Sequence, residues 1–233
     1  MASPSACSEI ELEVRRIREL SKASRHFDAL AAAEALAVRA PENRDIRYLM
    51  AANQRCLNRI PEAVETLERL EQQHPRFSLL YQERGYCYVT LRDARRAIDA
   101  FARAVTINPA LAASWSMLEH LYRMTGDETN AAAAAGQVAA LKQLPPEVVR
   151  AGSLFSDGEL SAAENILRAY LVSANHAEAL RLLARIEHQR NGLDEAEQLL
   201  AAALKLAPDY QAARLEYARI LVDRVASVTV FWV

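Results

Sequence analysis

Apolar and polar residues follow a helical period along much of the chain, and evenly spaced prolines interrupt the pattern. Alanine-rich segments with apolar positions three and four residues apart span 27–40, 61–73 and 94–107. This spacing predicts amphipathic helices. The prolines that follow these segments are 34 residues apart, at Pro41, Pro75 and Pro109. Because proline cannot continue a helix, we expect each of the three helices to end there.

The same period continues to the C-terminal part of the chain. Gly158 and Gly192 are 34 residues apart, as are Ala162 and Ala196. A helical period of this length is typical of a solenoid built from stacked helix pairs, with helix A followed by helix B in each repeat. The frames begin at Ile10, Arg44, Ser78 and Ala112 and, after a shortening by three residues before the fifth frame, at Gln143, Ala177 and Gln211.

The frame 78–111 has the clearest pattern. Its aromatic, small and proline positions are Tyr81, Gly85, Tyr88, Ala97, Phe101, Ala104 and Pro109. This pattern resembles the tetratricopeptide repeat, with Arg84 in place of the usual leucine. The resemblance extends over 10–224 and implies an all-α, right-handed superhelix in which the A helices line a concave groove. We expect Gly85 to lie where helices A and B approach each other closely.

These frames divide the chain into a disordered N-terminus (1–9), a solenoid (10–224) and an apolar tail (225–233). The repeats are expected at 10–43, 44–77, 78–111, 112–142, 143–176 and 177–210, with helix A of a seventh repeat at 211–224. The tail has no charged residue and is rich in strand-favouring residues, which predicts a strand-like segment. It is either a short native tail packed on the last helix or the product of a reading-frame change near Arg224 that removed the native continuation.

Composition and charge exclude several classes of protein. The 233 residues are 52% hydrophobic and 25% charged, as in a soluble globular protein, and the net charge of −2 gives no general attraction to nucleic acid or membranes. We find no signal peptide and no apolar stretch of about 18 residues, and therefore expect a cytoplasmic protein. Few of the basic residues are lysines and alanine is abundant, which indicates a GC-rich, bacterial coding sequence.

No motif for catalysis, metal binding or cofactor binding is present in the sequence. The chain has no phosphate-binding or dinucleotide-binding glycine loop, no serine elbow and no His-Glu-x-x-His motif. The three cysteines, Cys7, Cys56 and Cys87, match no metal or redox spacing. We therefore expect no catalytic residue, no metal and no cofactor in this chain.

The tetratricopeptide resemblance also implies which helix A positions face the groove. At those positions six arginines stand against four acidic residues, and arginine beside tyrosine suits carboxylate ligands. The alternative is a solvated helix face that binds no ligand. The candidate groove residues are Arg18, Tyr48, Arg55, Gln82, Tyr86, His120, Arg123, Arg181, Arg185, His188 and Arg219. Of these, Arg181 and Arg185 are four residues apart on one helix face and are the best candidates for a carboxylate contact.

The expected function is a scaffold that binds a protein or peptide, acidic ones included, and neither nucleic acid nor a membrane. The segments 144–147 and 217–223 also make the chain look like the N-terminal repeat array of bacterial proteins that carry a C-terminal sulfotransferase domain. In that alternative the catalytic domain is missing from this chain. An RNA-binding pentatricopeptide solenoid is disfavoured by the 34-residue period and the negative net charge.

Overall fold

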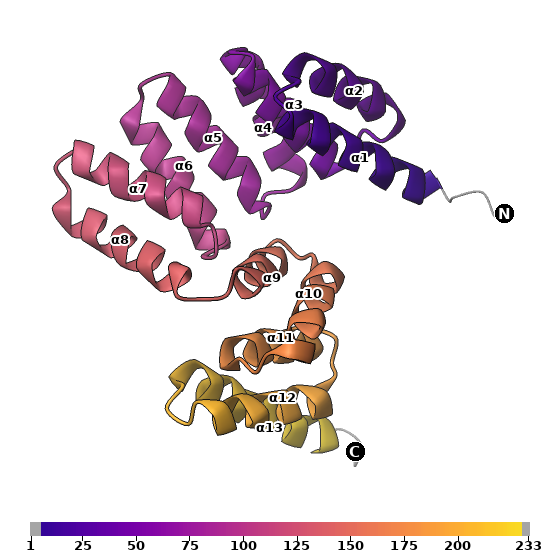
Figure 1. The fold of residues 1–233 in the computed structure, drawn as a ribbon, viewed down its shortest axis with the longest axis vertical. Helices are drawn as coiled ribbons and strands as arrows, with labels where there is room; N and C mark the ends of the chain where they lie inside the picture. Colours follow the sequence, from indigo (N-terminus) through magenta and orange to yellow (C-terminus); the bar gives the residue numbers. More distant parts are fainter. Residues whose placement is uncertain (1–5, 230–233) are drawn as a thin grey trace. The chain divides into compact units, whose positions relative to one another are not determined.

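A computed structural model describes residues 6–229 of the chain, shown in Figure 1. Over these residues it has thirteen α-helices and no strand, and the chain is an all-α helical-repeat solenoid, as predicted. The chain divides into two compact units, Met1–Val138 and Ala139–Val233, which are described separately. Over the described residues, none of the helices combines the length and apolar character needed to cross a lipid bilayer.

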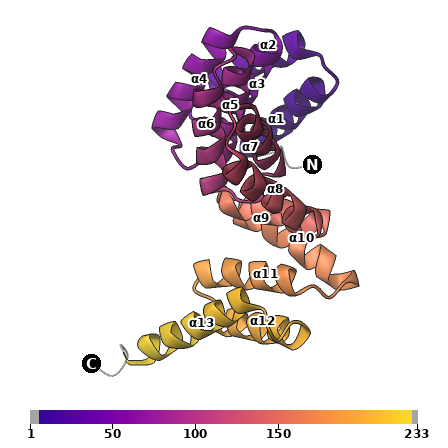
Figure 2. The ribbon, with the colours of Figure 1, turned by 90° about the vertical axis from the view of Figure 1, so that its left-hand side faces the viewer.

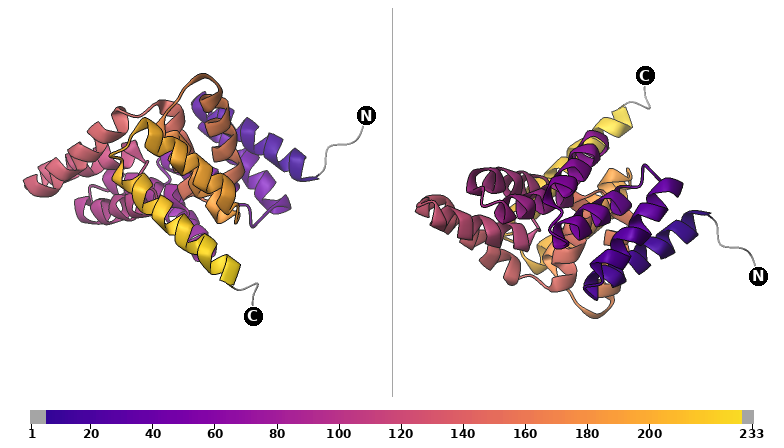
Figure 3. Two further views of the ribbon diagram at one scale, coloured as in Figure 1. Left: turned by 90° about the horizontal axis from the view of Figure 1, so that it is seen from below. Right: turned by 90° about the horizontal axis from the view of Figure 1, so that it is seen from above.

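Helices A and B alternate along the chain, and Figures 2 and 3 show their order from other sides. The A helices are α1 (Ala6–Lys22), α3 (Arg44–Cys56), α5 (Ser78–Thr90), α7 (Ala112–Met124), α9 (Pro146–Ser156), α11 (Ala177–Gln189) and α13 (Gln211–Thr229). The B helices are α2 (His26–Arg39), α4 (Ile60–Gln73), α6 (Ala94–Ile107), α8 (Glu128–Lys142), α10 (Leu160–Ser173) and α12 (Leu193–Leu206). Five A helices, α3, α5, α7, α11 and α13, begin at the first residue of an expected frame.

Each turn between helix A and helix B contains one residue with left-handed backbone conformation. These residues are Ser24 (φ 58°), Asn58 (61°), Arg92 (57°), Gly126 (80°), Gly158 (82°) and Asn191 (64°). The conformation lets the chain reverse after helix A, and glycine and asparagine adopt it most easily. Gly192, paired with Gly158 by sequence spacing, does not have this role. It precedes α12 with φ −82°, and Asn191 occupies the equivalent turn position.

The short repeat is the fifth, so the prediction of a shortening before Gln143 was wrong. Helix α9 begins at Pro146, 34 residues after the start of α7 at Ala112. Proline is favoured in the first turn of a helix, so Pro146 starts α9 and the fourth repeat keeps its full length. Helix α9 has 11 residues, whereas α7 and α11 have 13 each. As a consequence Leu144 precedes the helix, and Ala151 is fully buried rather than facing a groove.

Both ends of the chain differ from the sequence prediction. Helix α1 begins at Ala6, so residues 6–9 are helical rather than disordered, and α13 continues to Thr229, so residues 225–229 are helical rather than strand-like. Extending an existing helix costs much less free energy than starting one, and strand propensity has little effect without a neighbouring strand. Residues 1–5 and 230–233, which include the rest of both segments, lie outside the described part.

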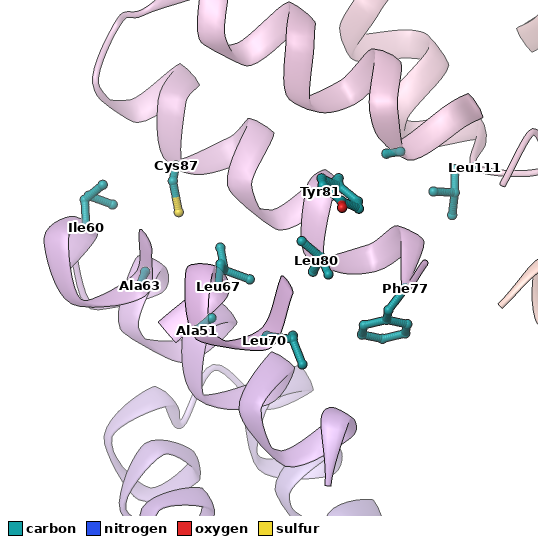
Figure 4. Close-up of a cluster of buried hydrophobic side chains, with 11 residues drawn as sticks. Ala51, Ile60, Ala63, Leu67, Leu70, Phe77, Leu80, Tyr81, Cys87 and Leu111 are labelled. Atoms are coloured by element: carbon teal, nitrogen blue, oxygen red, sulfur yellow. The ribbon is translucent and has the colours of Figure 1, made fainter. Parts of the chain in front are cut away.

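The core of the first unit forms where α3, α4 and α5 pack together. Leu67 and Leu70 of α4 and Leu80 of α5 are fully buried between these helices, and Figure 4 shows the cluster. At the next contact, between α5 and α6, the ring of Phe101 lies directly against Gly85. A Cβ atom on Gly85 would be 2.7 Å from Cζ of that ring. Helices α5 and α6 can therefore approach this closely only with glycine at position 85, in the role predicted from the sequence.

The second unit has its own core, built from α9 to α13. Leu167 and Ile186 are fully buried in one cluster, and Leu200 and Ile220 in the next. These clusters fix α9, α11 and α13 beside one another along one side of the second unit. They therefore determine which side chains of the three A helices lie close together.

Candidate ligand-binding groove

The candidate arginines of the first unit form ion pairs with the next helix A. Arg18 donates to Asp45 over 2.6 Å between Nη2 and Oδ2, and Arg55 forms a hydrogen-bonded ion pair with Glu83. Burial raises the pKa of the Glu83 carboxyl, and the positive charge of Arg55 opposes this shift. These arginines therefore join neighbouring repeats, and their charge is largely compensated within the protein.

The other candidates of the first unit also have contacts within the protein or are exposed. The ring of Tyr48 packs edge-on against Phe77 at 5.8 Å, and burial raises the pKa of its hydroxyl. The Gln82 amide oxygen accepts a hydrogen bond of 2.9 Å from Ser114. Tyr86 packs edge-on against Phe101, at 5.2 Å between ring centroids.

Two further candidates lie on α7. Arg123 pairs with Glu119 of its own helix at 2.7 Å, whereas His120 is exposed. An ion pair between exposed side chains one helical turn apart contributes little to stability, so Arg123 is readily available to another partner. Neither residue lines a pocket together with the other candidates of the first unit.

A pocket of about 300 Å³ opens in the second unit between α9, α11, α12 and α13. Its floor is apolar and comes from Phe155, Ala184, Leu200 and Ile220. Its rim is polar and includes the sequence candidates Arg185, His188 and Arg219, together with Gln189 and Glu216. Three of the four candidates in this unit therefore lie around one cavity.

Arg181, the fourth candidate of this unit, has all its charge compensated and does not line the pocket. Two of its nitrogens donate to Glu178 at 2.8 Å each, and Nη1 donates to Glu216 at 2.5 Å. Its side chain is only 13% exposed. The Tyr210 hydroxyl also donates to Glu178, which completes a network joining α11 to α13. Arg181 therefore holds the repeats together and has no free donor for a ligand.

Arg185, one turn further along α11, has no hydrogen-bond acceptor among the described residues. Its guanidinium carbon lies 4.4 Å from the centroid of the Phe155 ring, which fixes its orientation. The nearest carboxylate oxygen, on Glu216, is 3.7 Å from Nε and already accepts a hydrogen bond from Arg181. Burial lowers the pKa of Arg185, and Glu216 offsets this only in part. Arg185 is therefore a partly buried cation with unused donors at the edge of an apolar pocket.

The remaining rim residues also bring charge to the pocket. His188 Nε2 lies 2.9 Å from Asp223, and Arg219 lies 4.0 Å from the same carboxylate. The Arg219 side chain is 75% exposed, so it is free to move toward a bound group. Over residues 6–229, no group of histidine, cysteine, aspartate or glutamate side chains is arranged to hold a metal ion.

Sequence reasoning missed the acidic partners of these cations and the apolar floor of the pocket. A signal for the partners exists, because Glu216 follows Arg181 and Asp223 follows His188 by the same 35 residues. That interval is one repeat plus one residue, which places both acids on the next helix A. No comparable signal marks Leu200, which reaches the pocket from a B helix.

Comparison with protein families identifies one of the repeats directly. Residues 79–111 match the family model of the tetratricopeptide repeat. The chain contains a tetratricopeptide repeat. The match lies within the frame 78–111, on which the tetratricopeptide prediction was based, and confirms it there. The relationship to sulfotransferase-linked arrays stays a prediction.

Solved structures of similar fold support the same assignment along most of the chain. Pseudomonas aeruginosa pilF is 14% identical, with a TM-score of 0.53 over 92% of this chain and 97% of that one. A chain of the Naa15/Naa10 complex bound to HypK-THB is 20% identical, with a TM-score of 0.53 over 94% of this chain and 34% of that one. A chain of the Cut9–Hcn1 hetero-tetramer is 16% identical, with a TM-score of 0.50 over 89% and 42%. At these identities the likeness concerns the fold alone. No curated protein matches the chain in sequence.

Proposed function

We propose that the chain is a protein-interaction scaffold that binds a partner segment in the pocket of the second unit and catalyses no reaction. The fold supports this proposal, because tetratricopeptide solenoids commonly bind proteins or peptides. Two chains of similar fold belong to assemblies with protein partners, the Naa15/Naa10 complex bound to HypK-THB and the Cut9–Hcn1 hetero-tetramer.

The observation that carries the proposal is the unused guanidinium of Arg185 above an apolar floor. An oriented arginine edge recognises a carboxylate through paired, charge-assisted hydrogen bonds. The floor below it, from Phe155, Leu200 and Ile220, favours an apolar side chain. The proposed ligand is therefore a segment in which an acidic residue stands beside a large apolar one.

A display library of random peptides tests this proposal although the partner is unidentified. We expect the wild-type protein to enrich peptides with aspartate or glutamate beside leucine, isoleucine, methionine or phenylalanine. Arg185→Gln should weaken binding of the enriched peptides about tenfold or more, because a hydrogen bond to a charged group contributes roughly 1.5–3 kcal/mol. The matched control is Arg214→Gln, since Arg214 is an exposed arginine on α13 that does not line the pocket.

Three results would contradict the proposal. The first is that no peptide is enriched, and the second is enrichment without an acidic residue. The third is an equal loss of affinity in the Arg185→Gln and Arg214→Gln variants, which would indicate a general charge effect. Circular dichroism of each variant confirms that the helices are retained, so that a loss of binding is not caused by unfolding.

A further inference from the structure

A second pocket, of about 400 Å³, lies in the first unit between α4, α5 and α6. Its α5 side is formed by Tyr81, Arg84 and Tyr88, and its α6 side includes Arg96 and Arg103. We call this the arginine pocket. The candidate groove residues of α5, Gln82 and Tyr86, are not among its lining residues. The helical period also places them on a different face of the helix, so the arginine pocket is separate from any groove formed by the A helices.

Arg84 makes this pocket polar, and the repeat pattern does not require it. Tetratricopeptide repeats usually have leucine at this position, and the arginine side chain here is only 14% exposed. Its Nη1 lies 2.7 Å from Oε2 of Glu71, and its Nη2 donates to the Leu67 carbonyl oxygen at 3.3 Å. Burying a charged side chain in place of leucine costs desolvation free energy. We take this costly departure from the pattern as the first indication of a function.

Tyrosine rings hold all three guanidinium groups of the pocket. Arg84 and Arg103 lie over the Tyr81 ring at 5.6 and 5.7 Å, and Arg96 lies over the Tyr88 ring at 4.8 Å. A ring face orients a cation without cancelling its charge, whereas a carboxylate would cancel it. Arg103 has no ion pair with any described carboxylate, and Arg96 pairs with Asp93 at the outer end of the pocket. The pocket therefore contains oriented cations, one of them uncompensated.

The charge around the pocket also favours an anion. Residues 84–103 include five arginines and two aspartates, although the whole chain has a net charge of −2. Of the acidic groups that line the pocket, Glu71 is occupied by Arg84 and by the Tyr81 hydroxyl, which donates to it at 3.0 Å. Asp99 is the other, and it reduces the positive potential at the mouth without cancelling it.

We propose that the arginine pocket binds a phosphate group. Its donors come from two helices that meet at an angle around one space, and phosphate presents oxygens in several directions, whereas a carboxylate presents two in one plane. The volume leaves room for the group that carries the phosphate. The carrier is either free in solution, as inorganic phosphate or a small phosphate ester, or a phosphorylated residue of a peptide.

Titration of the full chain with inorganic phosphate, at constant ionic strength set with chloride, tests the proposal by calorimetry. Nuclear magnetic resonance of the arginine Nε–H groups reports which side chains respond. We expect Arg103→Gln to weaken phosphate binding about tenfold or more, because a hydrogen bond to a charged group is lost. Arg84→Leu should have the same effect while it restores the usual residue of the repeat. The matched control is Arg95→Gln, an exposed arginine of α6 outside the pocket, which should leave binding unchanged.

Parallel titrations with a phosphoserine peptide, its unphosphorylated form and acetate identify the ligand chemistry. Tighter binding of the phosphopeptide than of phosphate supports a peptide carrier, and equal binding supports a free phosphate or small ester. The proposal is overturned if phosphate binds no better than acetate, if the Arg84 and Arg103 signals do not respond, or if Arg95→Gln weakens binding as much as Arg103→Gln. Because the peptide pocket of the second unit shares no residue with this site, either proposal can fail alone.

Discussion

The contact between Gly85 and Phe101 allows a sharp test of the repeat packing. In Gly85→Ala, the new Cβ would lie 2.7 to 2.8 Å from three ring atoms of Phe101, where carbon atoms normally remain at least about 3.5 Å apart. The ring is fully buried, so it must move against its neighbours or push α5 and α6 apart. Overpacking of this kind typically costs about 1–3 kcal/mol.

A second glycine provides a matched control on the same substitution. Gly136 also lies inside a helix, α8, but a Cβ atom there would meet nothing within 4 Å. Replacing an exposed helical glycine with alanine usually stabilises a protein by about 0.5–1 kcal/mol, because the unfolded chain loses freedom. The same gain offsets part of the clash at Gly85. We therefore expect Gly85→Ala to destabilise the protein by about 1–2 kcal/mol and Gly136→Ala to stabilise it by up to about 1 kcal/mol.

Urea unfolding followed by circular dichroism measures both free energies. Because stability in repeat proteins depends on neighbouring repeats, the loss in Gly85→Ala should be seen in the main transition and not as a small separate one. The double variant Gly85→Ala with Phe101→Leu should be more stable than the sum of its single changes allows, since leucine withdraws from the clash. The reasoning is refuted if both glycine variants change stability in the same direction, or if the two changes at Gly85 and Phe101 are additive.

Three further predictions follow from backbone geometry and buried groups. Arg92→Gly should raise the free energy of unfolding by about 1 kcal/mol, because Arg92 has a φ of 57° that glycine adopts without strain; no gain in urea unfolding would contradict this. In a variant whose other two cysteines are serine, the Cys87 thiol, with a pKa raised to about 12 by burial, should react with a thiol reagent only as fast as the protein unfolds. Burial and the hydrogen bond to Glu178 raise the pKa of Tyr210 from 10.0 to about 12, so its contribution to stability is complete below pH 10 and is lost as the pH rises toward 12. The difference in unfolding free energy between wild type and Tyr210→Phe should therefore shrink over that range, and a constant difference would refute the assignment.

The sequence predicted the repeat register well wherever local backbone rules decide a boundary. Five A helices begin at the expected residue, because the prolines and small residues that set the period also end or pack the helices. It failed where two local rules competed. Pro145 and Pro146 lie at the junction where the sequence predicts a shortening, although Pro146 starts a helix of full register. The spacing likewise points to Gly192 for a turn that Asn191 forms.

The candidate site was predicted less well, because groove charge depends on contacts between repeats. The pattern identified Arg55, Arg181 and Arg185 as one class of side chain. Their environments differ, since Arg55 and Arg181 each hold a carboxylate of the next helix A, whereas Arg185 shares one that is already occupied. Counting charges along a face therefore overestimates what a ligand can use, and only the pairing across 28 to 35 residues separates structural from available cations.

The available cation lies where the repeat is irregular, and the irregularity accounts for it. Helix α9 is two residues shorter than the neighbouring A helices and ends just after Phe155, so this aromatic ring meets Arg185. A ring face orients the guanidinium but leaves its hydrogen-bond donors unused, which a carboxylate partner from the next repeat would not do. Departures from local rules in natural proteins are retained mainly where function offsets their cost. The short fifth repeat and the unused donors of Arg185 thus point to the same place, and lengthening α9 by two residues should displace Phe155 and weaken peptide binding while it leaves the arginine pocket of the first unit unchanged.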